Sequence, residues 1–233
     1  MPVNQEHRIL YFHIPKTAGS SVEELIGVDY DPKRARLDLL SRVNTETIPA
    51  YQHLLPDTVK RLLKEDGRFE QIWPTFFKFT VIRNPYDRAV STYHYLRRSD
   101  RFSHATRSFA DFLAFAAATV KDIEKRGDDE RYDKVPFLHH LRPQRHWFRP
   151  ENNVYDAVVK FESFDKDISE LYLALFGRYP ESLPRVNVTH AKDTTAGLWK
   201  QTCIDRPDAL ALFEESYGPD RVLGNTCYPP LRL

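Results

Sequence analysis

Hydrophobic runs and helically spaced apolar positions alternate along this chain of 233 residues. The stretches 9–12, 76–82 and 156–161 are rich in β-branched and aromatic residues, which is typical of buried strands. One segment with helical periodicity begins near Gly19. Further segments of this kind cover 31–44, 57–64, 85–97, 109–125 and 164–176. Asp57 is the expected N-cap of the helix at 57–64. The alternation predicts an α/β fold with a central, mainly parallel sheet flanked by helices.

Composition narrows the class of protein. A length of 233 residues and 41% hydrophobic content suit one globular domain, 1–233. A net charge of +1 argues against bulk nucleic-acid binding. Neither a membrane span nor a signal peptide is expected, so a cytoplasmic location is the default. Cys203 and Cys227 are too few for a disulfide scaffold and are not spaced as metal ligands, and whether they pair stays open.

The stretch Tyr11–Val22 combines a strand, a tight turn and a helix start. The turn contains one lysine and mostly small or hydroxylated residues, Lys16, Thr17, Ala18, Gly19, Ser20 and Ser21. Backbone N–H groups at a helix start can bind a phosphate, while hydroxyls and a lysine add donors and charge. The nucleoside-triphosphate loop has its lysine directly after the second glycine. Here the lysine precedes the nearby glycine by three residues, which disfavours that loop.

A second strand–turn–helix unit occupies 76–96. Arg83 ends the predicted strand, Asn84 can cap the helix, and Pro85 suits its first position. The unit would bring Arg83 and Ser91 to the sheet edge that carries the first loop, where α/β folds bind ligands. The plainer alternative is that Arg83 pairs with Asp87 and that Ser91 is an ordinary helical serine.

These two stretches resemble the sulfotransferases that use 3′-phosphoadenosine 5′-phosphosulfate (PAPS). PKTAGSS resembles their 5′-phosphosulfate loop, and FKFTVIRNPYDRAVSTYHY resembles the 3′-phosphate motif of the carbohydrate branch. The resemblance implies a P-loop-like α/β fold. It also implies that Lys16 and the rest of the loop hold the 5′ end of the donor, with Arg83 and Ser91 on the 3′-phosphate.

A third match to that branch covers roughly 136–177. The order His-x-x-Pro, Tyr-Asp-x-Val and Lys-Phe-Glu-Ser-Phe-x-x-Asp is similar. The basic and aromatic segment 139–149 is a candidate acceptor surface, with His140, Arg142 and Gln144 as substrate-binding candidates. A metal site is not expected there, because adjacent histidines cannot easily face one ion. The chain is expected to lack the membrane anchor and the cysteines of the Golgi members, which puts their usual acceptors in doubt.

The implied reaction moves a sulfuryl group from PAPS to a hydroxyl of a glycan or a glycosylated small molecule and releases adenosine 3′,5′-bisphosphate. Lys16 would neutralise the departing 5′-phosphate, and no metal is required. The expected general base is His53, because the carbohydrate branch has a histidine in this interval and neutral imidazole is available near pH 7. His140 is the second candidate, followed by Glu23 or Glu24. His13 is expected in the first strand as a structural histidine.

Two other functions fit parts of the sequence. An ATP-dependent small-molecule kinase could use the same scaffold, although the lysine is displaced and no apolar strand ends in a Mg²⁺-binding aspartate. A non-catalytic nucleotide-binding protein of this fold would bind the bisphosphate without turnover.

Overall fold

The computed structural model describes residues 3–28, 51–98, 102–103, 106–126, 138–148, 154–186 and 195–231. The chain forms two compact units. Unit 1 contains Met1–Ile82, Glu130–Pro136 and Trp147–Asn187, and unit 2 contains Arg83–Asp129, Phe137–His146 and Val188–Leu233. The helix predicted at 31–44 lies outside the described residues. That the whole chain acts as one domain stays a prediction.

Unit 1 is built on a four-stranded sheet with the order β1-β2-β3-β4. The strands are β1 (Val3–Asn4), β2 (Ile9–Phe12), β3 (Phe77–Ile82) and β4 (Ala157–Lys160). β1 is antiparallel to β2, whereas the β2–β3 and β3–β4 pairs are parallel. The predicted α/β class with a mainly parallel sheet is therefore confirmed.

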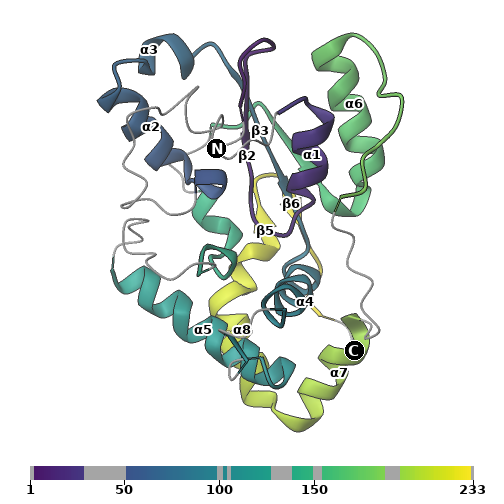
Figure 1. Ribbon diagram of the computed structural model, residues 1–233. Coiled ribbons are helices and arrows are strands. Elements are labelled where there is room, and N and C mark those ends of the chain that lie inside the picture. The colour runs from purple at the N-terminus through teal and green to yellow at the C-terminus, as the bar shows by residue number, and fades with distance from the viewer. Residues whose placement is uncertain are drawn as a thin grey trace. The chain divides into compact units, whose positions relative to one another are not determined.

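Helices cover the sheet of unit 1. Figure 1 shows α1 (Gly19–Leu25) and α6 (Phe164–Phe176) to one side of the strands, and α2 (Pro56–Glu65) and α3 (Phe69–Ile72) to the other. The core on the α1 and α6 side consists of apolar residues from the strands and both helices, namely Ile9, Tyr11, Val22, Ile26, Phe79, Val81, Val159, Phe164 and Ile168. Burial of these side chains fixes which face of each helix meets the sheet.

In unit 1, α1 begins where predicted, α2 is one residue longer at each end than predicted, and α6 has the predicted bounds. Helix α3 was not predicted. The expected cap of α2 is wrong, because Leu55 is the N-cap and Pro56 already occupies the first turn. Proline suits that position because the first helical N–H needs no intrahelical partner. Asp57 therefore lies inside the first turn, where its charge still complements the helix dipole.

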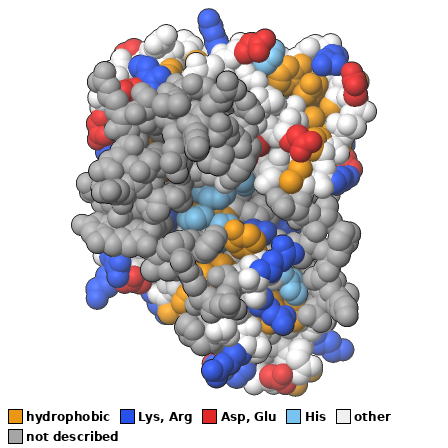
Figure 2. Space-filling view, viewed as in Figure 1, with side chains coloured by type: hydrophobic (Ala, Val, Ile, Leu, Met, Phe, Trp, Pro, Cys, Tyr) orange, Lys and Arg blue, Asp and Glu red, His pale blue; other side chains and the backbone are white. Residues whose placement is uncertain are grey.

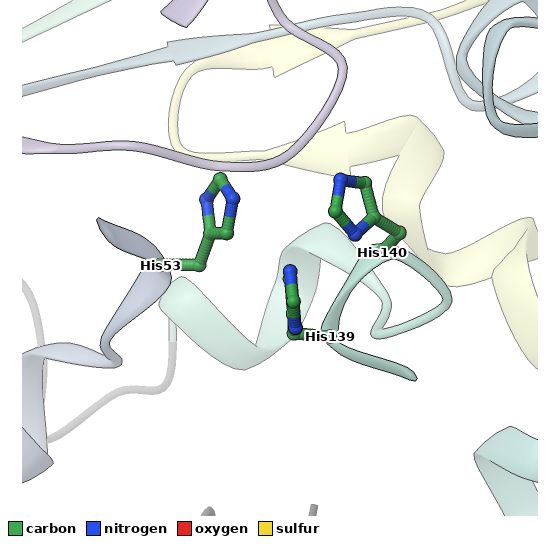
Figure 3. Close-up of side chains that lie close together, drawn as sticks. All are labelled: His53, His139 and His140. Carbon is green, nitrogen blue, oxygen red and sulfur yellow. The ribbon is translucent and has the colours of Figure 1, made fainter. Parts of the chain in front are cut away.

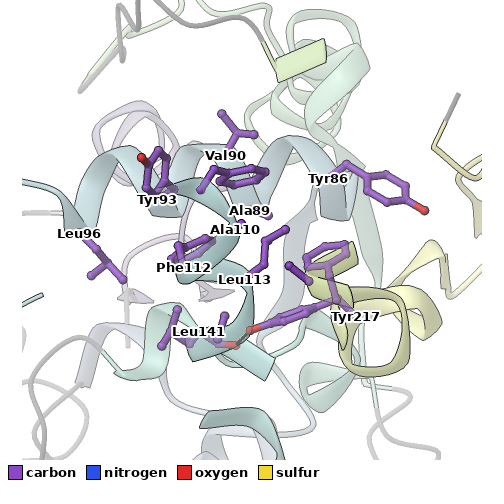
Figure 4. Close-up of a cluster of buried hydrophobic side chains, with 14 of the residues drawn as sticks. Tyr86, Ala89, Val90, Tyr93, Leu96, Ala110, Phe112, Leu113, Leu141 and Tyr217 are labelled. Atoms are coloured by element: carbon purple, nitrogen blue, oxygen red, sulfur yellow. Dashed lines mark hydrogen bonds between the residues drawn. The ribbon is translucent and has the colours of Figure 1, made fainter. Parts of the chain in front are cut away.

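Unit 2 is mainly helical. It contains α4 (Pro85–Leu96), α5 (Phe109–Lys125), α7 (Thr195–Asp205), α8 (Pro207–Tyr217) and the hairpin of β5 (Val222–Leu223) and β6 (Thr226–Cys227). Figure 4 shows the aromatic and aliphatic core that α4 and α5 share with neighbouring segments. The Asn84 cap is confirmed, since its Oδ1 accepts a hydrogen bond from the Tyr86 N–H.

Short 3₁₀ turns occupy several connections. They are η1 (Tyr51–His53), η4 (Leu138–His140), η5 (Gln144–Trp147), η7 (Phe161–Ser163) and η8 (Gly218–Arg221).

Among the described residues on the face in view in Figure 2, side chains of both charges are present. On that face, acidic and basic side chains of the described residues are interspersed with apolar ones (Figure 2). Cys203 and Cys227 are both free thiols. None of the helices in the described part of the chain has the length and apolar character that a membrane crossing needs.

Candidate active site

The loop after β2 has an unusual backbone. Lys16 (φ 70°) and Ala18 (φ 71°) both adopt the left-handed conformation. For a residue with a Cβ this conformation costs about 1–2 kcal/mol, and such strain concentrates at functional sites. Left-handed residues within a turn are typical of the backbone concavities that bind anions. The predicted order of strand, turn and helix start is confirmed, whereas phosphate binding by the loop stays a prediction.

The hydroxyl groups of this loop differ in their contacts. Thr17 Oγ1 donates to the Ile14 carbonyl (2.8 Å), and Ser21 Oγ accepts from the Val186 N–H (3.0 Å). These two hydroxyls thus shape the loop and its surroundings, while Lys16 and Ser20 are only partly buried. Helix α1 has seven residues and lacks a side-chain cap, so the loop itself rather than a long helix dipole defines the site.

Gly19 leaves room for an imidazole. A Cβ at this position would lie 1.8 Å from Nε2 of His13. The His13 ring therefore occupies the space that a side chain at 19 would need. His13 itself lies just beyond β2 rather than in the strand, which corrects the predicted position.

A buried carboxylate anchors this histidine. Oε1 of Glu23, on α1, lies 2.6 Å from Nδ1 of His13. Gln52 Nε2 lies 2.9 Å from both carboxylate oxygens of Glu23. This cluster was not predicted. A charged residue on the buried face of α1, next to Val22, was the signal that could have revealed it, because acidic side chains are rarely enclosed without partners.

His53, the predicted base, contacts the same segment. Its Nδ1 lies 2.9 Å from the main-chain oxygen of His13, and its ring meets the His13 ring edge-on at 4.5 Å. A carbonyl oxygen can only accept, so Nδ1 must carry a proton and the lone pair of the neutral ring is on Nε2. Figure 3 shows the ring at the end of η1, directed towards the chain that follows β2.

The second predicted motif starts from the neighbouring strand. β2 and β3 are adjacent and parallel, with Phe12 opposite Thr80, and Thr80 Oγ1 donates to the Phe12 carbonyl (2.7 Å). Both strands thus end at the same sheet edge. Arg83 directly follows β3 in the chain.

Within unit 2, Gln144 holds the main chain of Arg83. Its Oε1 accepts from the Arg83 N–H (3.0 Å), and its Nε2 donates to the Arg83 carbonyl (2.7 Å). Asp220, which is fully enclosed, accepts from the N–H groups of Gln144 (2.6 Å) and Arg145 (3.0 Å). Burial raises the pKa of the Asp220 carboxyl, against the lowering effect of Arg145, Arg88 and these N–H groups.

The candidate acceptor residues are enclosed. The exposed fractions are 7% for His140, 1% for Arg142 and 0% for Gln144. Arg88 on α4 donates to the carbonyls of His140 (3.2 Å) and Arg142 (3.0 Å), and the His140 ring stacks on Tyr95 at 4.6 Å. Figure 3 shows His139 and His140 on η4. A role of these residues in acceptor binding stays a prediction.

Ser91 lies two turns into α4 and is partly buried. Arg88, three residues earlier, is almost completely enclosed. Burial lowers the pKa of its guanidinium, although Asp220 and Tyr217 oppose this effect. The two residues therefore have different environments, and the buried arginine is the one that ties α4 to the segment 140–142.

A mainly parallel sheet with a strained, glycine-containing loop at the end of a strand is characteristic of phosphate-binding α/β proteins. The sulfotransferase family model matches residues 1–212, so this chain belongs to the sulfotransferase family. A solved structure of a sulfotransferase from Alicyclobacillus acidocaldarius is 18% identical, with a TM-score of 0.40. The similarity covers 92% of this chain and 99% of that one. No curated protein matches the chain.

Proposed function

We propose that this protein transfers a sulfuryl group from PAPS to a hydroxyl of a carbohydrate or glycosylated small molecule. The observation that carries the proposal is the loop Lys16–Gly19, with left-handed Lys16 and Ala18, at the end of β2. Its neighbour in the sheet is β3, which leads directly into Arg83. Membership of the sulfotransferase family supports the same reaction class.

The donor would be held by its two phosphorylated ends. Loop N–H groups, Lys16 and Ser20 would contact the 5′-phosphosulfate, while Arg83 and Ser91 would contact the 3′-phosphate. An arginine suits this second role because its guanidinium can bind phosphate oxygens in a bidentate manner. The enclosed amide of Gln144 supports the assignment, because it fixes the main chain from which the Arg83 side chain extends.

The chemical step is an in-line displacement at sulfur. The acceptor oxygen forms a bond to sulfur as the bond between sulfur and the bridging 5′-phosphate oxygen breaks. Nε2 of His53 takes the hydroxyl proton, and Lys16 neutralises the charge that develops on the departing bisphosphate. The contact of His53 Nδ1 with the His13 carbonyl supports this role, since it leaves Nε2 as the basic nitrogen.

Ligand selectivity tests the proposal. Adenosine 3′,5′-bisphosphate should raise the melting temperature much more than AMP or ATP does, with about 2.7 kcal/mol of stabilisation at a hundredfold excess over its dissociation constant. Arg83→Ala should remove most of this selectivity. Labelled PAPS offered with a panel of glycans, lipids and small alcohols would then identify the acceptor.

The two alternatives predict other outcomes. Equal shifts with ATP and the bisphosphate would overturn the proposal in favour of a kinase. A non-catalytic nucleotide-binding protein would bind the bisphosphate tightly and selectively. It would neither transfer a sulfuryl group to any member of the panel nor hydrolyse PAPS slowly.

A further inference from the structure

We propose that Glu23 is a positioning residue for His53 and that it acts through His13 and Gln52. The inference rests on the proposed function for the role of His53 as base. The inference also states which nitrogen of His53 carries the proton and which contacts fix that tautomer. This structural part does not depend on the reaction.

The carboxylate of Glu23 organises two chain segments at once. Only 2% of the residue is exposed, so its oxygens need donors from the protein. His13, which follows β2, and Gln52, in η1, approach the same carboxylate. A hydrogen bond to a charged acceptor is about twice as strong as one between neutral groups. Glu23 therefore ties the end of β2 to η1 through α1.

His53 lies where these two tethered segments meet. It is the residue after Gln52, and its Nδ1 lies 2.9 Å from the carbonyl oxygen of His13. Both partners of this hydrogen bond are thus held by Glu23, one through a neighbouring residue and the other through its own side chain. Without the tether the neutral ring could turn or move its proton to Nε2, which would remove the lone pair that accepts the hydroxyl proton.

Gly19 provides an independent test of the same arrangement. Its backbone is not left-handed, so alanine is conformationally acceptable there. The obstacle is steric, because the added Cβ would lie 1.8 Å from His13 Nε2. Gly19→Ala should therefore displace the His13 ring, while the residues Glu23, Gln52 and His53 themselves remain unsubstituted.

Nitrogen-15 NMR of the histidine rings measures the tautomer directly in the intact protein. At a pH where the ring is neutral, His53 of the wild type should carry its proton on Nδ1. In Glu23→Gln, which keeps the shape but removes the charge, we expect a mixture of tautomers. Turnover should fall at least tenfold, while the dissociation constant for the bisphosphate changes less than threefold. Gly19→Ala should give the same tautomer mixture.

Glu70→Gln is the control, because Glu70 is an exposed glutamate on α3 of the same unit and is no candidate for the site. It should leave both the tautomer and turnover unchanged. A wild-type His53 protonated on Nε2 would overturn the inference without any variant, even if Glu23→Gln failed to fold. An unchanged tautomer in folded Glu23→Gln would also overturn it. A correct tautomer response in a protein that does not transfer sulfuryl groups would instead reject only the proposed function.

Discussion

The side-chain amide of Gln144 hydrogen-bonds both main-chain polar groups of Arg83. An amide side chain can satisfy an N–H and a carbonyl together only when both its orientation and its position are fixed. Asp220 supplies that restraint by accepting the Gln144 main-chain N–H. The arginine proposed to bind the 3′-phosphate is thus held by a buried polar chain rather than by β3 alone.

Gln144→Glu should weaken bisphosphate binding. The glutamate would keep an acceptor for the Arg83 N–H but would face the Arg83 carbonyl with an oxygen instead of a donor. We expect a loss of about 1–3 kcal/mol in the free energy of unfolding and a dissociation constant raised by about tenfold or more. Calorimetric titration and chemical denaturation measure the two effects. Gln71→Glu, at an exposed position of α3, is the control. Unchanged bisphosphate affinity in folded Gln144→Glu would contradict the role of Gln144 in positioning Arg83.

Substitutions at Ala18 should report the strain of the donor loop. Glycine enters the left-handed region without penalty, so Ala18→Gly should leave stability unchanged or raise it by up to about 1 kcal/mol. Ala18→Val should lower it by at least about 1 kcal/mol, because a β-branched residue tolerates this region poorly. Ala174→Gly, at an exposed position of α6, should instead destabilise by about 1 kcal/mol. Equal losses from glycine at 18 and 174 would rule out the strained loop.

Removal of the Lys16 side chain should affect chemistry more than binding. Alanine at position 16 should retain the left-handed backbone, because alanine already adopts this conformation at position 18. Turnover should fall by about 10²–10³-fold, with a smaller loss in donor affinity, because the charge is needed most as the bridging oxygen departs. Lys200→Ala, at an exposed position, should behave as the wild type. A raised Michaelis constant with unchanged turnover would make Lys16 a uniform binder.

His53→Ala should separate proton transfer from donor binding. Loss of a positioned base costs about 10²–10⁴-fold in turnover, while bisphosphate affinity should stay nearly unchanged. The base must be neutral to act, so the fall in wild-type rate on the acid side should disappear in the variant. Steady-state rates across pH measure this, with exposed His7→Ala as the control. Retention of more than about a tenth of wild-type turnover would reject His53 and make His140 the next candidate.

Asp220 should give unfolding a distinctive pH dependence. Burial raises the pKa of its carboxyl above the usual ~3.9, so the native state binds this proton more readily than the unfolded chain does. Its contribution to stability is therefore fully present below the unfolded pKa and is lost as pH rises through the folded pKa. The stability of the wild type relative to Asp220→Asn should increase as pH falls towards about 4.

Urea unfolding of the two proteins at several pH values measures this difference. Asp205→Asn, at an exposed position of α7, corrects for the general acid response of the protein. A difference between wild type and Asp220→Asn that does not change with pH would contradict the raised pKa.

Much of the fold could be predicted because local patterns decide it. β2, α5 and α6 have the predicted bounds, since periodic apolar positions and flanking turn residues act over a few residues. α7 and α8 were not predicted. Their apolar residues, such as Trp199 and Phe213, are buried against α4 and α5, which are distant in the sequence. The hydrophobic pattern of a short segment does not show which distant partner will cover it.

By itself, the sequence determined which chemical groups follow each strand, namely Lys16 to Ser21 after β2 and Arg83 after β3. A few contiguous residues suffice for that, because strand, turn and helix signals are local. Only the tertiary structure decided that Glu23 joins His13 to Gln52, and that Gln144 holds Arg83 across 61 positions of sequence. Such contacts depend on the path of the whole chain, and a buried polar side chain takes whichever partners that path brings within hydrogen-bonding distance.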